Sequence, residues 1–188
     1  MINEDFLILV NEKDQPWGKL EKSLVHQLGI LHRAFSVFVF NSQGELLLQQ
    51  RADDKYHSGG LWTNSCCSHP RYGEELAHAV ERRLMEEMGI NCATNFEFGF
   101  VYKAEFENGL KEHEYDHVFF GVCDLTPCPD ESEVKNWKYI DMYALEAELK
   151  NNPQKYTAWL RICFDKVLLH YREFVVKSNL KIKENVSI

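Results

Sequence analysis

The stretch Trp62–Pro70, which reads WTNSCCSHP, decides how the rest of this chain is interpreted. It places the Cys67 thiol two residues before the His69 imidazole, in a polar run that ends in proline. A thiol can donate or accept a proton, attack an electrophile or bind a metal, and an imidazole can bind a metal or carry protons. Because the residue before a proline avoids the helical region, we expect His69 in an extended or turn conformation. We therefore predict a loop that carries reactive groups and is held between rigid elements.

The charged segment that follows is predicted to be a helix over Glu74–Met88, because Gly89 is a typical C-terminal stop. Arg83 precedes Glu86 and Glu87 by three and four residues, so ion pairs within the helix are the simplest interpretation. The alternative is that Glu87 holds a divalent cation while Arg83 contacts phosphate oxygens, since a cation is the usual bridge between carboxylates and a diphosphate. The whole charged set is Glu74, Arg82, Arg83, Glu86 and Glu87.

Short apolar and aromatic runs predict the strands of the fold. They are Phe6–Val10, Ala34–Phe40, Glu45–Gln50, Asn95–Phe106, Tyr115–Cys123 and Trp137–Ile140. Turns are expected at Gln15–Gly18 and at Gly109. A third turn, Asn41–Gly44, predicts that the second and third of these strands form a hairpin.

Two further helices are expected near the C-terminus, over Met142–Leu149 and over Gln154–Val176. Strands and helices mixed in this way predict an α+β fold or an α/β/α sandwich. The length of 188 residues fits one domain, 1–188, and the polar residues 177–188 are expected to form a frayed tail.

Charge and cysteine content restrict the class of partner and the compartment. The net charge of -8 argues against nucleic acid or an anionic membrane as the main partner. The six cysteines include no CxxC pair, the N-terminus is acidic, and the apolar runs are too short to span a bilayer. We therefore expect a cytoplasmic protein with free thiols.

Three histidines and two glutamates form the first candidate site. Glu112 and Glu114 are two residues apart, so on a strand their side chains point to the same face. Two carboxylates held close together repel unless a proton or a cation lies between them. With imidazoles nearby, such a set suits Mn²⁺, Mg²⁺ or Zn²⁺. The alternative is a solvated strand edge with scattered histidines; the candidate ligands are His26, His32, His69, Glu112 and Glu114.

Basic and aromatic residues form two further candidate groups. Singly, each cation is most simply a solvated surface charge, but four that converged would make a diphosphate clamp; they are Lys22, Arg51, Lys55 and Arg83. Core packing is the default interpretation of the aromatic rings, and lining an apolar pocket is the alternative; they are Trp62, Tyr102 and Trp159. The face of a tryptophan also stabilises a positive charge, by about 2 kcal/mol or more when desolvated.

Taken in chain order, these residues resemble the type 1 isopentenyl-diphosphate Δ-isomerases. The resemblance covers nearly the whole chain, and its most specific part is the pattern Thr-Asn-Ser-x-Cys-x-His-Pro. The charged helix alone is a weaker signal, because it is similar to the box of the wider Nudix superfamily. The matching segments are Leu20–Lys22, His26, Leu31–Ser36, Arg51, Lys55, Gly60–Pro70, the charged helix to Gly89, Glu112–Glu114 and Trp159. The resemblance implies a Nudix-like α/β/α sandwich, with a mixed sheet flanked by helices.

The box departs from the pattern of the Nudix hydrolases, Gly-x5-Glu-x7-Arg-Glu-x-x-Glu-Glu-x-Gly. Ser68 stands at the first glycine, and Arg83 stands where a hydrolase carries glutamate. Losing a carboxylate and gaining a cation weakens a hydrolytic site with several metal ions. The change suits binding of a diphosphate without its cleavage.

The resemblance also implies an activity, interconversion of isopentenyl diphosphate and dimethylallyl diphosphate in isoprenoid biosynthesis. Cys67 would be the catalytic thiol, Glu114 the catalytic carboxylate and Tyr102 the active-site tyrosine. The histidine–glutamate set would bind Mn²⁺, Mg²⁺ or Zn²⁺, while Glu87 and the backbone carbonyl of Cys67 would bind a second Mg²⁺ that arrives with the diphosphate. The substrate-contact positions would be Lys22, Arg51, Lys55, Ser68, Arg83 and Trp159.

The expected partner is thus a small-molecule diphosphate, bound by a monomer or weak homodimer. Two other functions compete with this one. A Nudix-type hydrolase would release phosphate and tolerate Cys67→Ala. A zinc-binding module without catalysis would use Cys66, Cys67 and His69 with another cysteine, and chelators would unfold it.

Overall fold

A nine-stranded mixed sheet is the centre of this computed structural model, which describes residues 6–55, 57–178 and 180. Its strands are β1 (Phe6–Val10), β2 (Pro16–Glu21), β3 (His32–Phe40), β4 (Leu46–Arg51), β5 (Trp62–Thr63), β6 (Cys66–Ser68), β7 (Thr94–Glu105), β8 (Lys111–Val122) and β9 (Val134–Ile140). The helices are α1 (Lys22–Leu28), α2 (Leu76–Met88), α3 (Met142–Asn151) and α4 (Ala158–Ser178), with a 3₁₀ turn, η1, at Pro153–Lys155.

Strand β3 organises the sheet because it pairs with several partners along its length. It runs parallel to β8 and antiparallel to β1 and β6. Strand β8 also pairs with β7 in a long antiparallel ribbon, and β4 carries β5 and β9. The register of β3 on β8 sets His32 beside Glu114, and the register of β3 on β6 sets Ser36 beside Cys67. These two registers position the candidate site.

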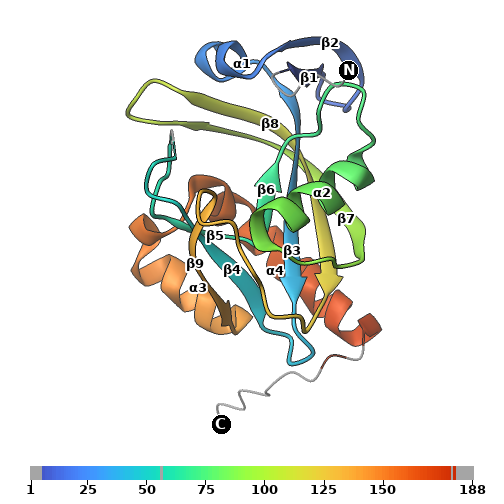
Figure 1. Cartoon of the computed structure of the whole chain (residues 1–188), viewed down its shortest axis with the longest axis vertical. Coiled ribbons are helices and arrows are strands. Elements are labelled where there is room, and N and C mark those ends of the chain that lie inside the picture. The colour runs from blue at the N-terminus through green and yellow to red at the C-terminus, as the bar shows by residue number, and fades with distance from the viewer. Residues whose placement is uncertain (1–5, 56, 179, 181–188) are drawn as a thin grey trace.

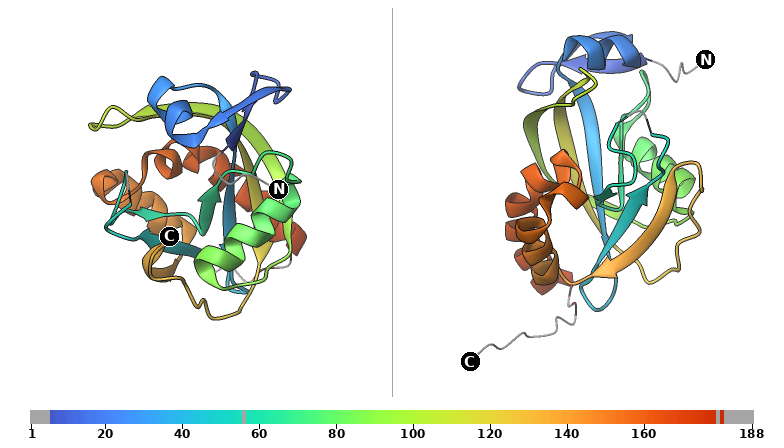
Figure 2. Two further views of the ribbon diagram at one scale, coloured as in Figure 1. Left: turned by 45° about the horizontal axis from the view of Figure 1, so that its top comes forward. Right: turned by 90° about the vertical axis from the view of Figure 1, so that its left-hand side faces the viewer.

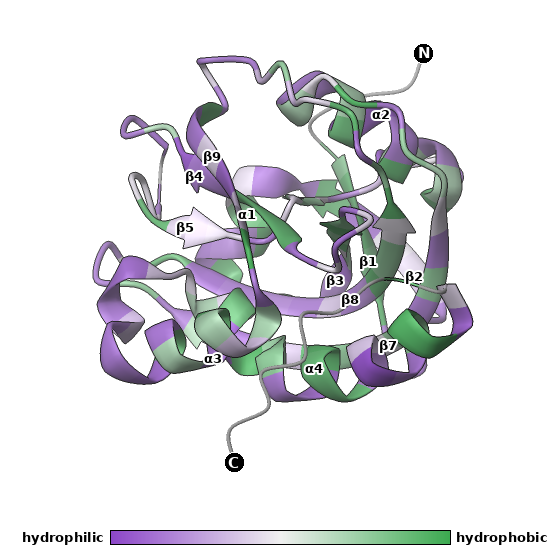
Figure 3. Cartoon of the chain, turned by 90° about the horizontal axis from the view of Figure 1, so that it is seen from below, coloured by the Kyte–Doolittle hydropathy of each residue, from purple (hydrophilic) through white to green (hydrophobic). Residues whose placement is uncertain are grey.

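Helices cover both faces of the sheet, as Figure 1 and the side view in Figure 2 show. The alternation of a strand assigns residues of β3 to opposite faces. Phe35 and Val37 pack toward Leu84 of α2, whereas Phe38 and Phe40 belong to the core shared with α3 and α4. Figure 3 shows the matching alternation of hydrophobic and hydrophilic segments along α4. The expected α+β fold, with a mixed sheet flanked by helices, is confirmed.

The N-terminal unit of β1, β2 and α1 lies over one end of β3 and β8 (Figure 1). The turn predicted at Gln15–Gly18 is wrong, because β2 already begins at Pro16. The chain reverses earlier, where Asn11 Oδ1 accepts hydrogen bonds from the backbone N–H groups of Lys13 and Gln15. Asp14 adopts the left-handed conformation there, with φ of 58°. An Asx turn, rather than the Pro-Trp-Gly sequence, therefore closes this hairpin.

The turn at Asn41–Gly44 forms as predicted, but the hairpin around it is minimal. Only Phe40 and Leu46 are paired between β3 and β4. The two strands then diverge, and the short strands β5 and β6 pair with β4 and β3 respectively. This divergence brings the Trp62–Pro70 stretch into the middle of the molecule.

The three predicted helices all form, but α2 begins at Leu76 rather than Glu74, and the last helix also begins later than predicted. Helix α2 ends where expected, with Gly89 in the left-handed conformation at φ of 65°. The last helix begins at Ala158 rather than Gln154, because Pro153–Lys155 forms a separate 3₁₀ turn. Of the predicted frayed tail, Lys177 and Ser178 lie in α4, and residues 179 and 181–188 lie outside the described residues. None of the helices within the described ranges has the length and apolar character needed to cross a membrane.

Candidate active site

Three imidazoles and two carboxylates converge where α1, β3, β8 and the end of β6 meet. One side-chain ligand atom from each residue lies within 4.8 Å of the ligand atom of every other; the residues are His26, His32, His69, Glu112 and Glu114. The parallel pairing of β3 with β8 explains part of this arrangement, since it sets His32 directly beside Glu114. Glu112 and Glu114 share one face of β8, as predicted from their spacing.

Backbone carbonyls orient two of these imidazoles. His26 Nδ1 lies 2.7 Å from the carbonyl oxygen of Lys22, and His32 Nδ1 lies 2.9 Å from that of Ile30. A carbonyl can only accept, so both Nδ1 atoms carry hydrogen, and in the neutral rings the Nε2 lone pairs face the cluster. A hydrogen bond from the second ring nitrogen to a carbonyl is the usual support of a metal-binding histidine.

The imidazole and carboxylate atoms that face each other in this cluster lie within hydrogen-bond distance. His69 Nε2 lies 2.8 Å from Glu114 Oε1 and 3.1 Å from His32 Nε2. Burial would raise the pKa of Glu114, but the neighbouring imidazoles of His32 and His69 outweigh it and hold that pKa well below its usual range. Burial lowers the pKa of His69 to about 4. The site therefore contains a carboxylate anion against a neutral imidazole, which is the protonation that a divalent cation requires.

A shared ion would fit this donor set. Metal–ligand distances of about 2.0–2.2 Å place opposite ligands about 4.4 Å apart, close to the 4.8 Å limit that contains the five donor atoms. Glu112 Oε2 is buried and accepts no hydrogen bond from the described residues, and His26 Nε2 lies 3.3 Å from it. An acceptor in that position calls for a cation. Nitrogen and oxygen ligands together suit Mn²⁺, Mg²⁺ or Zn²⁺.

The Cys67 thiol faces the same region from β6. Its sulfur lies 2.8 Å from Asn64 Oδ1, to which it donates, and it accepts a hydrogen bond from Trp159 Nε1 at 3.1 Å. Burial, together with the charges of Asp116 and Glu87, raises the pKa of Cys67 to about 12. The thiol is thus protonated at neutral pH in these surroundings, and added positive charge would favour its thiolate.

Asn64 fixes the thiol and was missed by sequence reasoning, although it lies only three residues before Cys67. Its Nδ2 donates to the carbonyl oxygens of Val37 at 3.1 Å and Cys66 at 2.9 Å. Both amide hydrogens are therefore used, and Oδ1 must point at Cys67. The hydroxyl of Thr63 donates to the same Oδ1 at 3.0 Å. A long-range partner, the carbonyl of Val37 on β3, sets this orientation, and a sequence pattern cannot reveal it.

The neighbouring thiol, Cys66, points the other way. It is fully buried in the apolar core formed with α2, beside Val37 and Leu84. Opposite directions are expected for adjacent residues of an extended strand. The zinc-module alternative needed both thiols at one site, and the cluster of potential ligands contains neither of them.

Tyr102 belongs to the site through the register of β7 on β8, which pairs it with Glu114. Its hydroxyl donates to Glu114 Oε2 at 2.6 Å. Burial, together with the charge of Glu114, raises the pKa of Tyr102 well above its usual value, so the phenol keeps its proton. Glu114 thus faces the imidazoles with one oxygen and the phenol with the other.

One cavity is lined both by these groups and by the basic residues, which are far apart in the sequence. The predicted residues among its lining are Lys22, Arg51, Lys55, Cys67, Ser68, His69, Arg83, Glu87, Tyr102, Glu112, Glu114 and Trp159. The cations thus converge as the clamp interpretation requires. Trp62 is an exception among the aromatic candidates: it packs against the apolar core, with Lys138 Nζ 4.5 Å from its ring centroid.

Helix α2 makes the internal ion pairs of the simpler interpretation and also lines the cavity. Arg83 donates to Glu86 at 2.7 Å and to Glu87 at 2.6 Å, and these carboxylates raise its pKa above the usual range despite burial. Arg82 instead donates hydrogen bonds to both carboxylate oxygens of Glu74, at 2.7 and 2.9 Å. Hydrogen bonds from Arg82 lower the pKa of Glu74. Arg82 and Glu74 therefore fasten the start of the helix, while Arg83 and Glu87 face the cavity.

Glu133 and His57 are among the cavity residues that were not found from the sequence. Glu133 precedes β9 and contacts both Lys55 and Arg83. His57 Nε2 lies 2.9 Å from Glu112 Oε1, and its ring stacks on Phe106 with centroids 4.5 Å apart. Neither residue belongs to a motif, because each reaches the site through tertiary folding.

The fold and this site define the class of protein first. The NUDIX domain family model matches residues 30–160, more than half of the chain. Solved structures support the same fold: the Deinococcus radiodurans protein DR0079 is 20% identical and covers 86% of this chain and 98% of its own, with a TM-score of 0.71. The MutT protein of Methanosarcina mazei is 19% identical and covers 77% of this chain and 95% of its own, with a TM-score of 0.61.

Curated relatives then identify the family within that class. The protein named isopentenyl-diphosphate Delta-isomerase 1 of Aromatoleum aromaticum is 52% identical over 165 residues, which span 88% of this chain and 93% of the relative. The isopentenyl-diphosphate Delta-isomerase of Pectobacterium atrosepticum is 45% identical over 168 residues, 89% of this chain and 94% of the relative. This chain is an enzyme and belongs to the isopentenyl-diphosphate Δ-isomerase family. The resemblance inferred from its motifs is confirmed.

Proposed function

We propose that this enzyme interconverts isopentenyl diphosphate and dimethylallyl diphosphate by protonating one face of an alkene and deprotonating the other. The names of its relatives support the reaction. The observation that carries the mechanism is one cavity lined by a thiol, a carboxylate–phenol pair and a set of cations; those residues include Cys67, Glu114, Tyr102, Lys22, Arg51, Lys55 and Arg83. An unactivated alkene is a poor base, so a proton donor and a proton acceptor must flank it.

Glu114 and Tyr102 form the donor side. The phenol keeps its proton because its pKa is raised by burial, and it is hydrogen-bonded to the carboxyl group at 2.6 Å. A proton on this pair can therefore pass between the two oxygens and reach the alkene from one face. A divalent ion at the histidine–glutamate cluster would supply positive charge that orients Glu114 and makes the pair more acidic.

Cys67 forms the acceptor side. Acceptance of a proton from carbon requires the thiolate, whereas burial keeps the pKa of this thiol at about 12. The Trp159 N–H, 3.1 Å from the sulfur, would stabilise negative charge on it. Positive charge brought by the diphosphate-bound Mg²⁺ and by the carbocation would further favour the thiolate, so the acceptor forms only when substrate is present.

Trp159 would also stabilise the carbocation and help to keep water away from it. Trp159 is 4% exposed and lines the cavity, and the Arg51 guanidinium carbon lies 5.3 Å from its ring centroid. The face of an indole attracts a cation, and a closed apolar wall keeps out the water that would trap the carbocation as an alcohol.

Diphosphate binding provides the positioning energy. Lys22, Arg51, Lys55 and Arg83 would contact its oxygens with Ser68, and Glu87 with the Cys67 carbonyl would hold the accompanying Mg²⁺. Burial lowers the pKa of Lys22, and a bound phosphate would keep it charged. Arg83 in place of a box glutamate removes one hydrolytic metal ligand, so the same clamp binds the diphosphate without cutting it.

The remaining expectations concern the setting of the enzyme. We propose a cytoplasmic protein that acts on a free small molecule, as a monomer or weak homodimer, without nucleic acid or membrane. The net charge of -8 supports this, because it disfavours anionic polymers and surfaces, while the cations that meet the substrate are gathered in one cavity.

The decisive experiment follows the product directly. Incubation with isopentenyl diphosphate and Mg²⁺ in heavy water should yield dimethylallyl diphosphate, with deuterium entering at the carbons where protons are exchanged, as read by NMR. Phosphate should not be released. Release of phosphate without the allylic product would favour the hydrolase alternative and overturn the proposal.

A further inference from the structure

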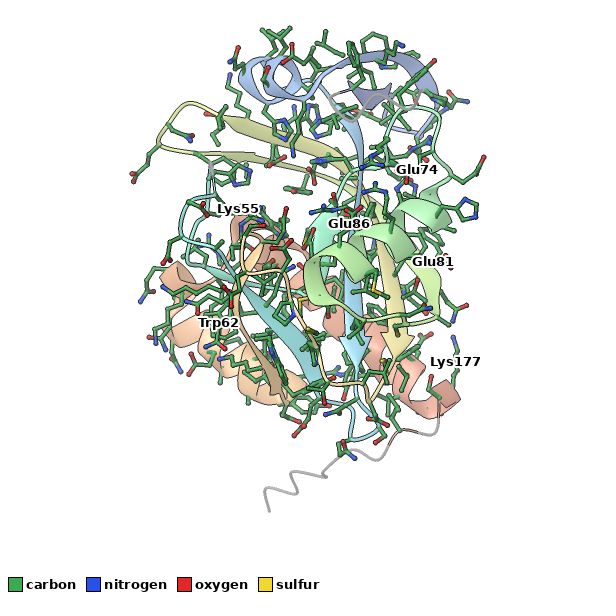
Figure 4. All side chains as sticks on the ribbon, in the orientation of Figure 1. Lys55, Trp62, Glu74, Glu81, Glu86 and Lys177 are labelled. Atoms are coloured by element: carbon green, nitrogen blue, oxygen red, sulfur yellow. The ribbon has the colours of Figure 1, made fainter. Side chains whose placement is uncertain are left out.

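Glu133 occupies the clamp although it belongs to no motif. Its Oε2 accepts a hydrogen bond from Lys55 Nζ at 2.5 Å and lies 3.3 Å from Arg83 Nη2. One carboxylate oxygen therefore bridges two of the cations that would contact the diphosphate. Figure 4 shows Lys55 on the loop between β4 and β5, and Glu86 on α2, the helix that carries Arg83.

The backbone around Glu133 is fixed, so this contact is built into the fold. Its carbonyl accepts a hydrogen bond from Ala52 N at 3.0 Å, and its own N–H donates to Asp130 at 3.0 Å. Val134 then begins β9 opposite Arg51, at an irregularity in the β4–β9 pairing. The side chain leaves this anchored position toward the cavity that it lines.

Two of the four cations of the clamp, Lys55 and Arg83, are already neutralised by carboxylates without a ligand. Arg83 is paired with Glu87 at 2.6 Å as well as with Glu133, and Lys55 is paired with Glu133. Burial would raise the pKa of Glu133, but the hydrogen bond from Lys55 and the charge of Arg83 outweigh it and lower that pKa, so the carboxylate is ionised. A bare diphosphate would have to displace these pairs and then lie against two carboxylates.

We infer that Glu133 makes the clamp selective for the Mg²⁺ complex of the diphosphate over the metal-free diphosphate. The inference rests on the diphosphate clamp of the proposed function and assigns a role to a residue outside it. Like charges held a few ångströms apart in a half-buried site repel, and a divalent cation between them reverses the sign of the interaction. Glu87 would bind the cation, and Glu133 would penalise any anion that arrives without one.

Selectivity of this kind is a coupling between two ligands. The factor by which Mg²⁺ tightens diphosphate binding equals the factor by which diphosphate tightens Mg²⁺ binding. If Glu133 supplies much of the repulsion, removing its charge must reduce this factor. The reduction must come from tighter binding of the bare anion, rather than from weaker binding of the complex.

Calorimetric titration with inorganic diphosphate tests the inference. The protein is first loaded with Mn²⁺ at the histidine–glutamate cluster and freed of excess ions, then titrated with and without Mg²⁺. Glu133→Gln keeps the size of the side chain and removes its charge, so it should bind metal-free diphosphate about tenfold more tightly, within the usual range of coupling factors. Binding of the Mg²⁺ complex should change by less than about threefold, and Glu131→Gln, on the exposed part of the same loop, should behave like the wild type.

Unchanged or weaker binding of metal-free diphosphate by Glu133→Gln would overturn the inference, and leave the proposed function intact if product still forms. A wild type that binds no diphosphate under either condition would overturn the clamp and the inference together. Glu133→Ala serves as the second variant if the glutamine protein does not fold, since it removes the same charge and should shift binding in the same direction.

Discussion

At the scale of single residues, the two adjacent cysteines show how an extended backbone separates function from packing. Cys66 is fully buried against α2, whereas Cys67 lines the cavity and contacts Asn64 and Trp159. The same chemical group therefore has two environments one residue apart. Their substitution offers a matched pair of variants, in which each serves as the control for the other.

Cys67→Ala should lower kcat for isomerisation by at least about 100-fold, the usual contribution of a positioned proton acceptor or donor. Cys66→Ala should keep turnover near that of the wild type, because its thiol faces away from the cavity, and should lose a small amount of stability through the missing core atom. Steady-state rates of allylic product formation, with thermal unfolding of both variants, provide the measurement. Near-normal turnover in Cys67→Ala would refute the acceptor role.

At the scale of elements, the sequence predicts those features that local chemistry controls. Helix α2 and its stop at Gly89 are local, and so is the common face of Glu112 and Glu114 on β8. The turn predicted at Gln15–Gly18 does not form, because the side chain of Asn11 closes the hairpin earlier in the chain. The proline and the glycine in that segment are typical turn residues, but the Asx turn at Asn11 forms instead.

The candidate site divides in the same way between local and long-range causes. Cys67 and His69 are recognisable because they are close together in one segment. Asn64 is oriented by a strand residue on β3, and Glu133 is held by Lys55 and by the arginine of α2 that faces the cavity. These partners are far apart in the sequence, so no local pattern reveals their contacts. Charge sign and residue type predicted which groups could meet, whereas the registers of β3 and β8 decided which of them do.

The end of α2 carries a prediction at this scale. Gly89 and Gly109 both have positive φ, at 65° and 81°, so alanine at either position costs about 1–2 kcal/mol of backbone strain. At Gly89 the added methyl would also overlap the carbonyl oxygen of Cys128, while at Gly109 nothing lies within 4 Å. Gly89→Ala should therefore lower the free energy of unfolding clearly more than Gly109→Ala, as measured by urea denaturation. Equal losses would show that the loop around Cys128 moves aside without cost.

At the scale of the whole molecule, the histidine–glutamate cluster joins the N-terminal helix α1 to the central strands of the sheet. His26 comes from α1, His32 from β3, His69 from the segment after β6, and Glu112 and Glu114 from β8. In Figure 1 the N-terminal unit that carries His26 lies over one end of the long β7–β8 ribbon. An ion held by all of these residues would therefore join the N-terminal unit to the central sheet, besides orienting Glu114.

This connection predicts a thermal shift that is separate from catalysis. An ion at about 100 times its dissociation constant stabilises the folded state by about 2.7 kcal/mol. For a domain of this size that corresponds to a rise in Tm of about 5–10 °C. Mn²⁺ added to chelator-treated protein should produce this rise, and EDTA should reverse it, with circular dichroism as the readout.

The matched variants decide whether that shift comes from the cluster. His26→Ala removes one ligand from α1 and should abolish most of the Mn²⁺-dependent rise, because the remaining ligands no longer tie the N-terminal unit to the ion. His113→Ala lies between Glu112 and Glu114 on the same strand but is outside the ligand set, with its Nδ1 3.0 Å from the carbonyl of Gly29. It should keep the rise, whatever its own effect on the starting Tm. If both variants responded to Mn²⁺ like the wild type, the stabilising ion would have to bind elsewhere, and the proton-donor role of Glu114 would lose its metal support.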